Sequence, residues 1–490
     1  MKTFAEIEKE YESIPIDYVR DGTKTSGVFS LSRRKSDVIL SSEQPLNFQA
    51  QENGWFDFRV KVADGKSILF HNALMAPGTR YHSWGVSQQC EEHIFPNIVV
   101  INPENLAEND GVSSLTFQIL GLENFFHYMH VDRCSLHKLP SEDMDFLQRL
   151  VRKQSKPDTF FDPLDLYITH CPQQAFKFQR GKDIYEINFS ATFSGGWGGK
   201  IQHSYYPIAR IIFEKPRPID DALDAIWEWK RFFSQMAMAD LPVTAIAFYG
   251  TEESFKDEAS VYLPNLKSVP EPDSEQDRFH PGDIPLNFWE DRDRLKDALS
   301  HWLSKNAARQ EFRCLVSWVL KRMEQRFSSD DIITLCSAIE SLDELTPEAL
   351  PSKKDIRILV EGALAAAQSK NVDIGMDRLQ GILSMLGKPG LPAKLGLLMD
   401  RVSPFVVKED ASQLIKLILK IRNMAAHGDF IHDTTMPLDG PITEALAGVC
   451  VLFDLLDCGV PIEAHPHSLI CPAQRIKAAL VAIKKINAVA

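Results

Sequence analysis

The periodicity of hydrophobic and polar positions changes once along the chain. From about residue 27 to residue 263, short runs rich in Val, Ile, Phe and Tyr alternate with polar residues and are separated by Gly, Pro and Asn. Such alternation is typical of strands that bury one face. After about residue 286, apolar residues recur every three or four positions, as in amphipathic helices. The pattern therefore predicts an α+β protein, with a mostly antiparallel β-rich amino-terminal region followed by an all-α helical bundle.

The β-rich region is predicted to contain several strands and one long helix. Residues 56–62 and 67–70 flank the turn Ala63-Asp64-Gly65-Lys66 and predict a hairpin. Other strand-like runs are 97–101, 115–120, 175–178, 184–193, 206–213 and 243–249. Residues 220–238 follow Pro218 and carry a broad apolar face made of Leu223, Ile226, Trp227, Trp229, Phe232 and Phe233. This segment predicts a helix that packs against the sheet.

A boundary is predicted at residues 266–285, where four prolines stand among acidic and polar residues. We therefore expect a β-rich region over 1–265, this linker, and a helical domain over 286–490. Helical spacing occurs at 288–305, 310–325, 331–345, 354–368, 373–386, 392–402, 411–426, 441–456 and 472–486.

Composition limits the classes of function. Hydrophobic residues make up 44% of the chain and charged residues 25%, as in soluble globular proteins. The formal net charge of -13 argues against nonspecific coating of nucleic acid, so a nucleic-acid substrate would need a local basic patch. Eight cysteines without a CxxC pair, and a start without an apolar signal, predict a cytoplasmic protein. The longest apolar run, 445–456, is too short to span a membrane.

The most informative motif is Arg422-Asn423-Met424-Ala425-Ala426-His427. Arginine binds a phosphate in a planar fork, histidine transfers protons near neutral pH, and asparagine can orient either group. A chain of this composition would contain Arg-Asn-x3-His by chance only about 0.02 times. The trio therefore indicates cleavage of a phosphodiester.

The motif ends a predicted amphipathic helix. Asp410 with Gln413 resembles a capping box and Gly428 is a stop signal, so we expect a helix over 411–427. Its predicted core stripe consists of Leu414, Leu417, Ile418, Ile421 and Ala425. On another face, Lys416 and Lys420 lead to Asn423 and His427 and form a candidate RNA-binding strip. The alternatives are a solvated lysine face and a histidine that is stabilised by the helix dipole.

These residues carry a family resemblance. The sequence RNMAAH resembles the Arg-polar-x3-His signature of HEPN domains, the helical domains of many prokaryotic ribonucleases. A long β-rich region followed by such a domain resembles the ApeA-like anti-phage family. Residues 115–126, LTFQILGLENFF, are similar to a strand followed by a "GLE-aromatic" segment in that family's first domain. Residues 335–340 give a weaker match.

The resemblance implies a metal-independent endoribonuclease without a cofactor, acting as a homodimer or higher homo-oligomer in which two motif helices face each other. Arg422, Asn423 and His427 would be the catalytic residues. The RNA could be a tRNA, and the amino-terminal region would sense a phage-derived trigger or restrain the nuclease. Two alternatives stay open: a non-catalytic dimeric module that binds RNA or a partner, and the toxin of a toxin–antitoxin pair.

Glu340 lies beside an apolar stripe of its predicted helix. We therefore expect it to pair with Arg422 and support the site, although an ordinary surface glutamate fits as well. One group of residues has the types that bind metal ions but lacks the spacing of a paired zinc knuckle. It consists of His127, His130, Cys134 and His137, with Cys90, His93, His170 and Cys171 as possible additions.

The glycine-rich stretch 193–201 lacks the spacing of a phosphate loop and predicts a hairpin loop with Trp197 at its tip.

Overall fold

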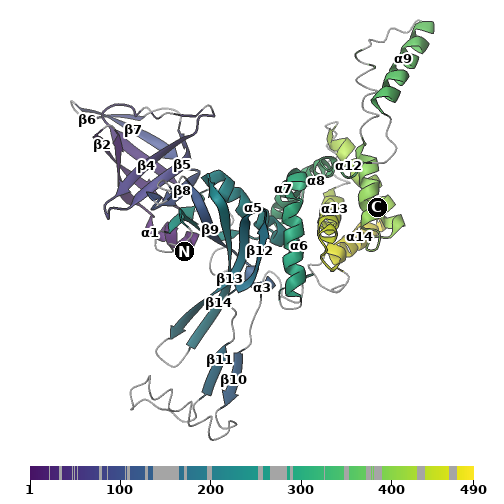
Figure 1. Cartoon of the computed structure of the whole chain (residues 1–490). Coiled ribbons are helices and arrows are strands. Elements are labelled where there is room, and N and C mark those ends of the chain that lie inside the picture. Colours follow the sequence, from purple (N-terminus) through teal and green to yellow (C-terminus); the bar gives the residue numbers. More distant parts are fainter. Residues whose placement is uncertain are drawn as a thin grey trace.

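The structure is a computed structural model. It describes residues 1–20, 22–32, 36–46, 48, 50–51, 53–76, 80–84, 87–104, 106, 111–126, 131–135, 165–169, 174–195, 201–251, 258–264, 284–286, 288, 291–324, 326–346, 352–370, 377, 379, 389–426, 436–462 and 472–489. Within these residues the protein is α+β, as predicted, with a β-rich part followed by a helical part (Figure 1).

The β-rich part is built on one 14-stranded sheet, whose order is β12-β13-β14-β9-β15-β16-β8-β5-β4-β1-β2-β3-β7-β6. All the pairings in the described residues are antiparallel. The strands are β1 Ile14–Arg20, β2 Thr23–Ser30, β3 Asp37–Ser42, β4 Phe56–Val62, β5 Ser67–Met75, β6 Arg80–Trp84, β7 Ser87–Phe95, β8 Ile98–Ile101, β9 Val112–Ile119, β12 Gln174–Arg180, β13 Asp183–Gly195, β14 Ile201–Arg217, β15 Val243–Tyr249 and β16 Ala259–Tyr262. The predicted β4–β5 hairpin is confirmed.

One end of the sheet closes into a ring. Strand β5 pairs with β4 on one edge, and on its other edge it pairs first with β8 and then, at Leu74 and Met75, with β7. The ring β4-β1-β2-β3-β7-β5 therefore surrounds its own core. Phe70 lies in this core, with its ring centroid 4.8 Å from those of Phe29 and Phe58.

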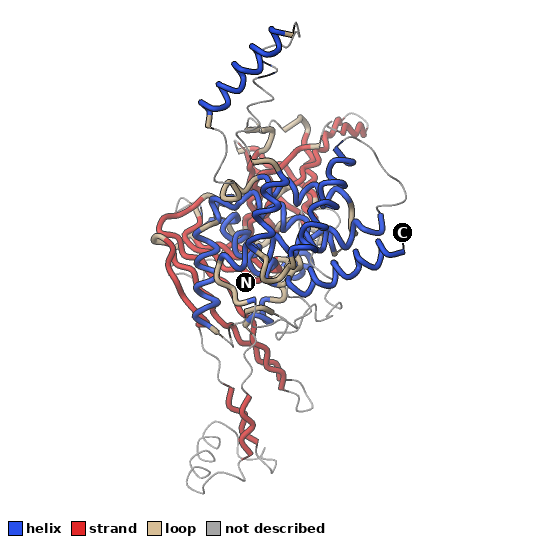
Figure 2. The backbone as a smooth tube through the Cα atoms, turned by 90° about the vertical axis from the view of Figure 1, so that its right-hand side faces the viewer, coloured by secondary structure: helices blue, strands red, loops and turns tan. Residues whose placement is uncertain are grey.

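The open part of the sheet is covered by helix α5 (Ile219–Met236), which confirms the predicted amphipathic helix. Trp229 is fully buried, with its ring 5.9 Å from Phe117 of β9 and 6.0 Å from Tyr185 of β13. Trp227, predicted on the same face, is only partly buried. A two-stranded sheet, β10 (Val131–Ser135) and β11 (Asp165–Thr169), projects away from this body (Figures 1 and 2).

The helical part agrees with the predicted helices where the structure describes them. Its helices are α6 Arg292–Ser304, α7 Asn306–Met323, α8 Ser329–Glu340, α9 Lys353–Ser369, α11 Leu391–Arg401, α12 Lys408–Ala426, α13 Met436–Asp457 and α14 Pro472–Val489. Helix α9 stands off from the others in both views (Figures 1 and 2). Most of the predicted helix 373–386, and the linker 266–285 up to residue 283, lie outside the described residues.

Helix α5 joins the two parts. Phe232 of α5 packs edge-on against Trp302 of α6, with centroids 5.5 Å apart. Glu228 of α5 accepts hydrogen bonds from Arg180 of β12 at 3.0 Å and from Asn306 of α7 at 2.6 Å. One carboxylate therefore contacts the sheet and the helical part at the same time.

The predicted start of the motif helix was wrong. Helix α12 begins at Lys408, so Asp410 is in its first turn and is not its capping residue. Asp410 instead pairs with Lys484 of α14, with 2.7 Å between the Oδ1 and Nζ atoms. The helix dipole favours a carboxylate in the first turn as well as at the capping position, so the local sequence does not distinguish the two positions. None of the helices within the described residues combines the length and the hydropathy of a membrane-spanning segment.

Candidate functional site

The carboxy-terminal end of α12 carries the described part of the motif. Leu414, Ile418 and Ile421 are buried where α12 packs against α8, α11 and α13. Each such side chain contributes roughly 1.5–3 kcal/mol on burial, which fixes the helix to the bundle. The predicted core stripe is confirmed at these three positions, whereas Leu417 is only partly buried.

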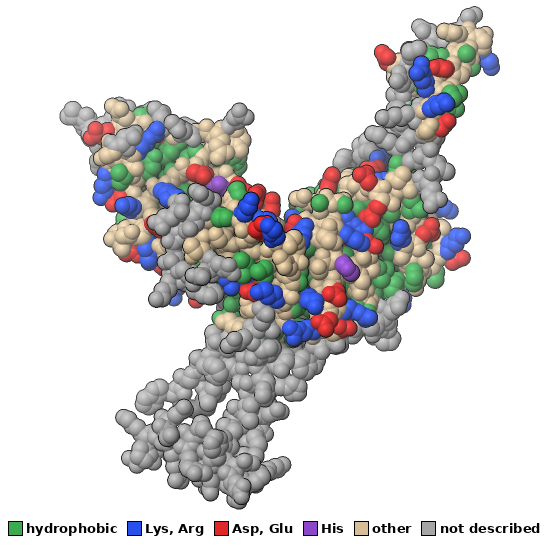
Figure 3. Space-filling model, viewed as in Figure 1, with side chains coloured by type: hydrophobic (Ala, Val, Ile, Leu, Met, Phe, Trp, Pro, Cys, Tyr) green, Lys and Arg blue, Asp and Glu red, His purple; other side chains and the backbone are tan. Residues whose placement is uncertain are grey.

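The opposite side of α12 faces solvent. Lys416, Lys420 and Asn423 are exposed, in line with the predicted second face of this helix. Elsewhere on the helical part, basic and acidic side chains are interspersed on the face seen in Figure 3. Exposure alone does not distinguish a binding strip from a solvated lysine face, so RNA binding by these lysines stays a prediction.

Arg422 lies beside Glu340, the last residue of α8. The guanidinium Nη2 is 3.8 Å from the carboxylate Oε1, and the two side chains are 41% and 43% exposed. Arg422 Nη1 also donates a long hydrogen bond of 3.5 Å to Oδ1 of Asn423. A pair this exposed contributes at most about 1 kcal/mol, so it orients Arg422 without saturating its donors. The expected contact between Glu340 and Arg422 is therefore present, while any role in chemistry is untested.

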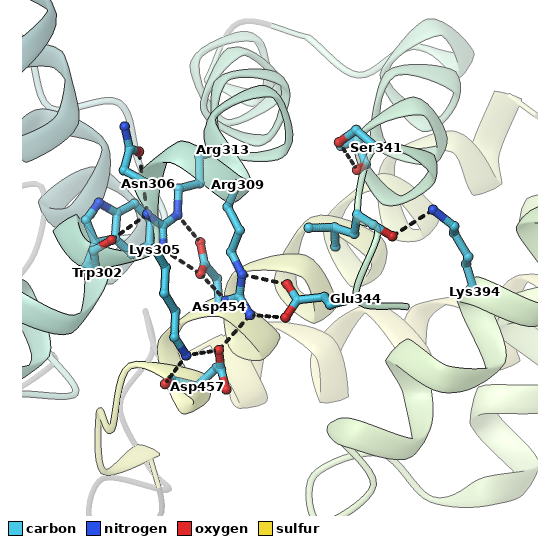
Figure 4. Close-up of polar contacts among 12 residues, drawn as sticks. Trp302, Lys305, Asn306, Arg309, Arg313, Ser341, Glu344, Lys394, Asp454 and Asp457 are labelled. Atoms are coloured by element: carbon cyan, nitrogen blue, oxygen red, sulfur yellow. Dashed lines mark hydrogen bonds and ion pairs between the residues drawn. The ribbon is translucent and has the colours of Figure 1, made fainter. Parts of the chain in front are cut away.

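Lys394 of α11 holds the end of α8 in place. Its ammonium group donates to the carbonyl oxygens of Glu340 at 2.6 Å and Leu342 at 2.7 Å. Figure 4 shows one of these contacts from Lys394. The side chain is 5% exposed, and this burial lowers its pKa. The sequence offered one signal for this role: Lys394 interrupts the buried stripe of Leu391, Leu395 and Leu398.

Cys336 lies one turn before Glu340 and is not a nucleophile in this environment. Burial raises the pKa of its thiol to about 12; the charge of Glu340 also raises it, and Arg422 lowers it. The thiolate is therefore negligible at neutral pH, and Cys336 acts as a small buried apolar side chain.

His427, the predicted proton-transfer group, lies outside the described residues, as do residues 428–435. The described part of the motif is thus Arg422 and Asn423, on the last turn of α12. The structure brings together Arg422, Asn423 and Glu340, while Lys416 and Lys420 lie further back along the same helix.

A second arginine cluster lies deep in the bundle and was not predicted. Arg313 of α7 forks onto Asp454 of α13, at 2.8 Å from Nε and 2.9 Å from Nη2, and both side chains are fully buried. Arg309 donates to the same carboxylate at 2.7 Å and also reaches Glu344 and Asp457 (Figure 4). The sequence signal was Asp454 itself, the single charge in the apolar run 445–456.

The other sequence candidates add no chemistry in the described residues. His127, His130, His137, His170 and Cys171 lie outside them, as do the side chain of Cys134 and residues 196–200 with Trp197. Cys90 is buried in β7 with its sulfur 3.9 Å from the carbonyl of Glu43. Among the described residues, no group of three or more His, Cys, Asp or Glu side chains could hold a metal ion.

The "GLE-aromatic" segment has a structural role. Gly121, with φ of 86°, adopts a left-handed conformation that favours glycine and starts the short helix α3 (Leu122–Phe125). Phe125 and Phe126 then enter the core: Phe125 lies 5.0 Å from Phe233 of α5, and Phe126 lies 5.6 Å from Phe288. The segment anchors the end of β9 beneath α5.

These observations define an α+β protein whose helical part presents an arginine-based site at the end of one helix. Comparison with protein families gives a match to a model described as ApeA N-terminal domain 1, over residues 40–302. The match covers more than half of the chain, and the chain belongs to the ApeA-like family. Searches of the curated proteins and of the solved structures found no match.

Proposed function

We propose that this protein is a metal-independent endoribonuclease of anti-phage defence that cuts RNA at a site built around Arg422, Asn423 and His427. Its place in the ApeA-like family supports a role in defence. The observation that carries the ribonuclease proposal is the exposed Arg422 on the last turn of α12, with Asn423 beside it and His427 one turn further along the sequence.

In the proposed reaction the ribose 2′-oxygen attacks the adjacent phosphorus. His427 takes the 2′-hydroxyl proton, or donates a proton to the departing 5′-oxygen. Arg422 donates hydrogen bonds to the phosphate oxygens, where negative charge develops, and Asn423 orients the phosphate or the imidazole. The P–O5′ bond breaks, which leaves a 2′,3′-cyclic phosphate and a 5′-hydroxyl.

One chain supplies one Arg and one His from the motif, while the reaction needs a base, an acid and stabilisation of charge. We therefore propose a homodimer or higher homo-oligomer in which two α12 helices face each other, so that the site is shared. The exposed side chains on α12 are compatible with such an approach. The β-rich region, by analogy with its family, would respond to a phage-derived trigger.

The test is end-mapping of RNA after incubation with the full-length protein in the presence of a chelator. We expect fragments with 2′,3′-cyclic phosphate ends from the wild type and none from His427→Ala. Undiminished cleavage by His427→Ala contradicts the proposal, and so does cleavage that is lost in chelator and restored only by added metal. RNA binding without cleavage would instead favour a non-catalytic binding module.

A further inference from the structure

An aromatic and basic surface lies at the opposite end of α8 from Arg422. Trp318 of α7 is 50% exposed and Phe327, just before α8, is 45% exposed. Arg322 links the two positions, because it contacts the Trp318 ring and the hydroxyl of Ser328, the residue after Phe327. Side chains of this size lose free energy when left in water, and exposed aromatic rings beside arginines are typical of a binding surface. Neither is used by the proposed catalytic site.

These side chains are held in place rather than free to rotate away. The Arg322 guanidinium carbon lies 4.6 Å from the Trp318 ring centroid, in a cation–π contact. Arg322 is fixed in turn by Asp331 at 3.1 Å and by the Ser328 hydroxyl at 3.4 Å. The Phe327 ring rests against Gly440 of α13, where an added Cβ would come within 3.3 Å of it. The surface is therefore preorganised.

Charge favours an anionic ligand here. Arg326, next to Phe327, is exposed, and Lys321 is partly exposed on the last turn of α7. Two exposed acidic side chains lie nearby in sequence: Glu324, which accepts a hydrogen bond from the Asp240 amide at 3.0 Å, and Asp330. A protein partner would usually meet a continuous apolar patch, whereas here the two rings stand among guanidinium groups. Surfaces that bind single-stranded nucleic acid typically combine two features. Bases stack on aromatic rings and guanidinium planes, and nearby cations pair with the phosphates.

Helix α8 connects this surface to the Arg422 site. Polar residues that are exposed or partly exposed, Asp330, Thr334, Ser337 and Glu340, follow one side of the helix from its start to its end. The helix has 12 residues, and at about 1.5 Å per residue it spans roughly 18 Å. A stacked strand rises about 3.4 Å per nucleotide, so this length corresponds to about five nucleotides.

From this geometry we infer that Trp318 and Phe327, with Arg322 and Arg326, form a base-stacking subsite for single-stranded RNA about five nucleotides from the phosphate held at Arg422. The inference rests on the proposed function, because it takes RNA as the ligand of the Arg422 site. It adds a footprint: the RNA runs along α8, and bases distant from the cut contribute to binding.

The test uses the full-length protein and fluorescently labelled single-stranded RNA with 2′-O-methyl groups, which cannot undergo 2′-oxygen attack. Affinity is measured by anisotropy for oligonucleotides of about 3 and about 12 nucleotides, the longer of which fits a single-strand site of ordinary size. We expect Trp318→Ala to weaken binding of the longer RNA by about 10- to 100-fold, the range for loss of one stacked base. Binding of the shorter RNA should not change.

Two further variants sharpen the result. Trp318→Phe keeps an aromatic face and should restore most of the affinity, and Val481→Ala, which shortens an apolar side chain 51% exposed on α14, should have no effect. Equal affinity of Trp318→Ala and wild type for the longer RNA overturns the inference, and so does failure of the wild type to bind either RNA. A changed oligomeric state by sedimentation, with RNA affinity unchanged, also overturns it and assigns the surface to a second copy of the chain.

This experiment separates the subsite from the catalytic proposal because it measures binding of RNA that cannot be cut. Trp318-dependent binding by a protein that never produces cyclic-phosphate ends would retain the subsite and reject the ribonuclease. Cleavage that is indifferent to Trp318 at every RNA length would retain the ribonuclease and reject the subsite.

Discussion

Two arginine sites in the same helical bundle differ in how completely their charges are matched. In the first, Arg313 and Asp454 are fully buried and Arg309 is 3% exposed, with every contact at hydrogen-bond distance. In the second, Arg422 and Glu340 are each about two-fifths exposed and lie 3.8 Å apart. The buried site joins residues of α7 and α13, and the exposed site joins residues of α8 and α12.

The difference separates a charge whose hydrogen bonds are all used within the fold from one that is left available to a ligand. A buried ion pair must have its hydrogen bonds satisfied, because an uncompensated charge in a low dielectric is very unfavourable. Burial lowers the pKa of Arg309, but the hydrogen bonds and charges of Glu344 and Asp454 outweigh burial and raise the pKa above its already high ordinary value, so its charge is fixed. An exposed pair is weak, but it leaves donors that a phosphate can take. An arginine–carboxylate pair therefore stabilises the fold in one place and is suited to bind a ligand in the other.

The largest expected effect is on the buried cluster. Asp454→Ala leaves the guanidinium groups of Arg313 and Arg309 without their shared carboxylate, and should lower the free energy of unfolding by about 3–5 kcal/mol. Urea denaturation measures it. Glu344→Ala, which removes a 45% exposed partner of Arg309, is the matched control and should cost about 1 kcal/mol or less. Equal losses in the two variants would break the contrast between buried and exposed carboxylates.

Arg422→Ala should have the opposite effect to Asp454→Ala, a large loss of RNA cleavage with little loss of stability. Loss of a donor to the developing phosphate charge should lower the rate of RNA cleavage by about 10²–10³-fold. The free energy of unfolding should change by no more than about 0.5 kcal/mol, because the pair with Glu340 is exposed. Cleavage rates and urea denaturation are measured on the same preparation. A destabilisation as large as that of Asp454→Ala would show that Arg422 is a structural residue.

A third charged cluster, intermediate in exposure, gives a pH test. His71 lies between Asp57 of β4 at 2.7 Å and Asp220 of α5 at 3.2 Å, and these two carboxylates are the charged groups that act on it. Burial lowers the pKa of His71, but the two carboxylates outweigh it and the pKa is raised; the pKa of Asp57 is lowered chiefly by its hydrogen bond from His71, against desolvation.

The sign follows from these two directions. Because the pKa of His71 is raised on folding, the protonated imidazole stabilises the fold fully below its pKa in the unfolded chain, about 6.5. This stabilisation is lost as pH rises through the pKa of His71 in the folded protein. A lowered aspartate pKa stabilises above about 3.9 and loses it as pH falls. The stability difference between wild type and His71→Gln should therefore be largest near pH 5, on the order of 1 kcal/mol, and shrink by pH 8. Urea denaturation across pH 4–8 measures this difference. A difference that is independent of pH would show that ion pairing of His71 with Asp57 and Asp220 does not stabilise the fold.

The smallest effect is expected at Glu340. Glu340→Gln removes the carboxylate that competes with phosphate for Arg422, so the KM for RNA should fall about two- to threefold while the free energy of unfolding changes by less than about 0.5 kcal/mol. Steady-state cleavage kinetics measure the KM. Glu361→Gln, which removes the carboxylate of an exposed ion pair with Arg357 on α9, is the control. A rise in KM would indicate that Glu340 positions Arg422 more than it competes for it.

Elements with strong local periodicity were predictable from the sequence. The stripe of Leu414, Ile418 and Ile421 predicted α12 correctly, and alternation predicted the β4–β5 hairpin. Positions where a distant group overrides the local signal were not predictable from the sequence. Asp410 has the sequence of a cap, but Lys484 on α14 binds it within the first turn. Nothing local to Arg309 or Arg313 reveals that Asp454, more than 140 residues away, matches both.

By itself the sequence determined which segments are helices and strands, and it placed the Arg-Asn-x3-His motif after an apolar helical stripe, because hydrophobic periodicity is a local property of the chain. The tertiary structure alone decided that β5 and β7 close a ring, which of the two alternatives for Glu340 holds, and which arginines are buried. Those contacts join residues far apart in sequence, and only packing fixes the burial that separates a saturated ion pair from one open to a ligand.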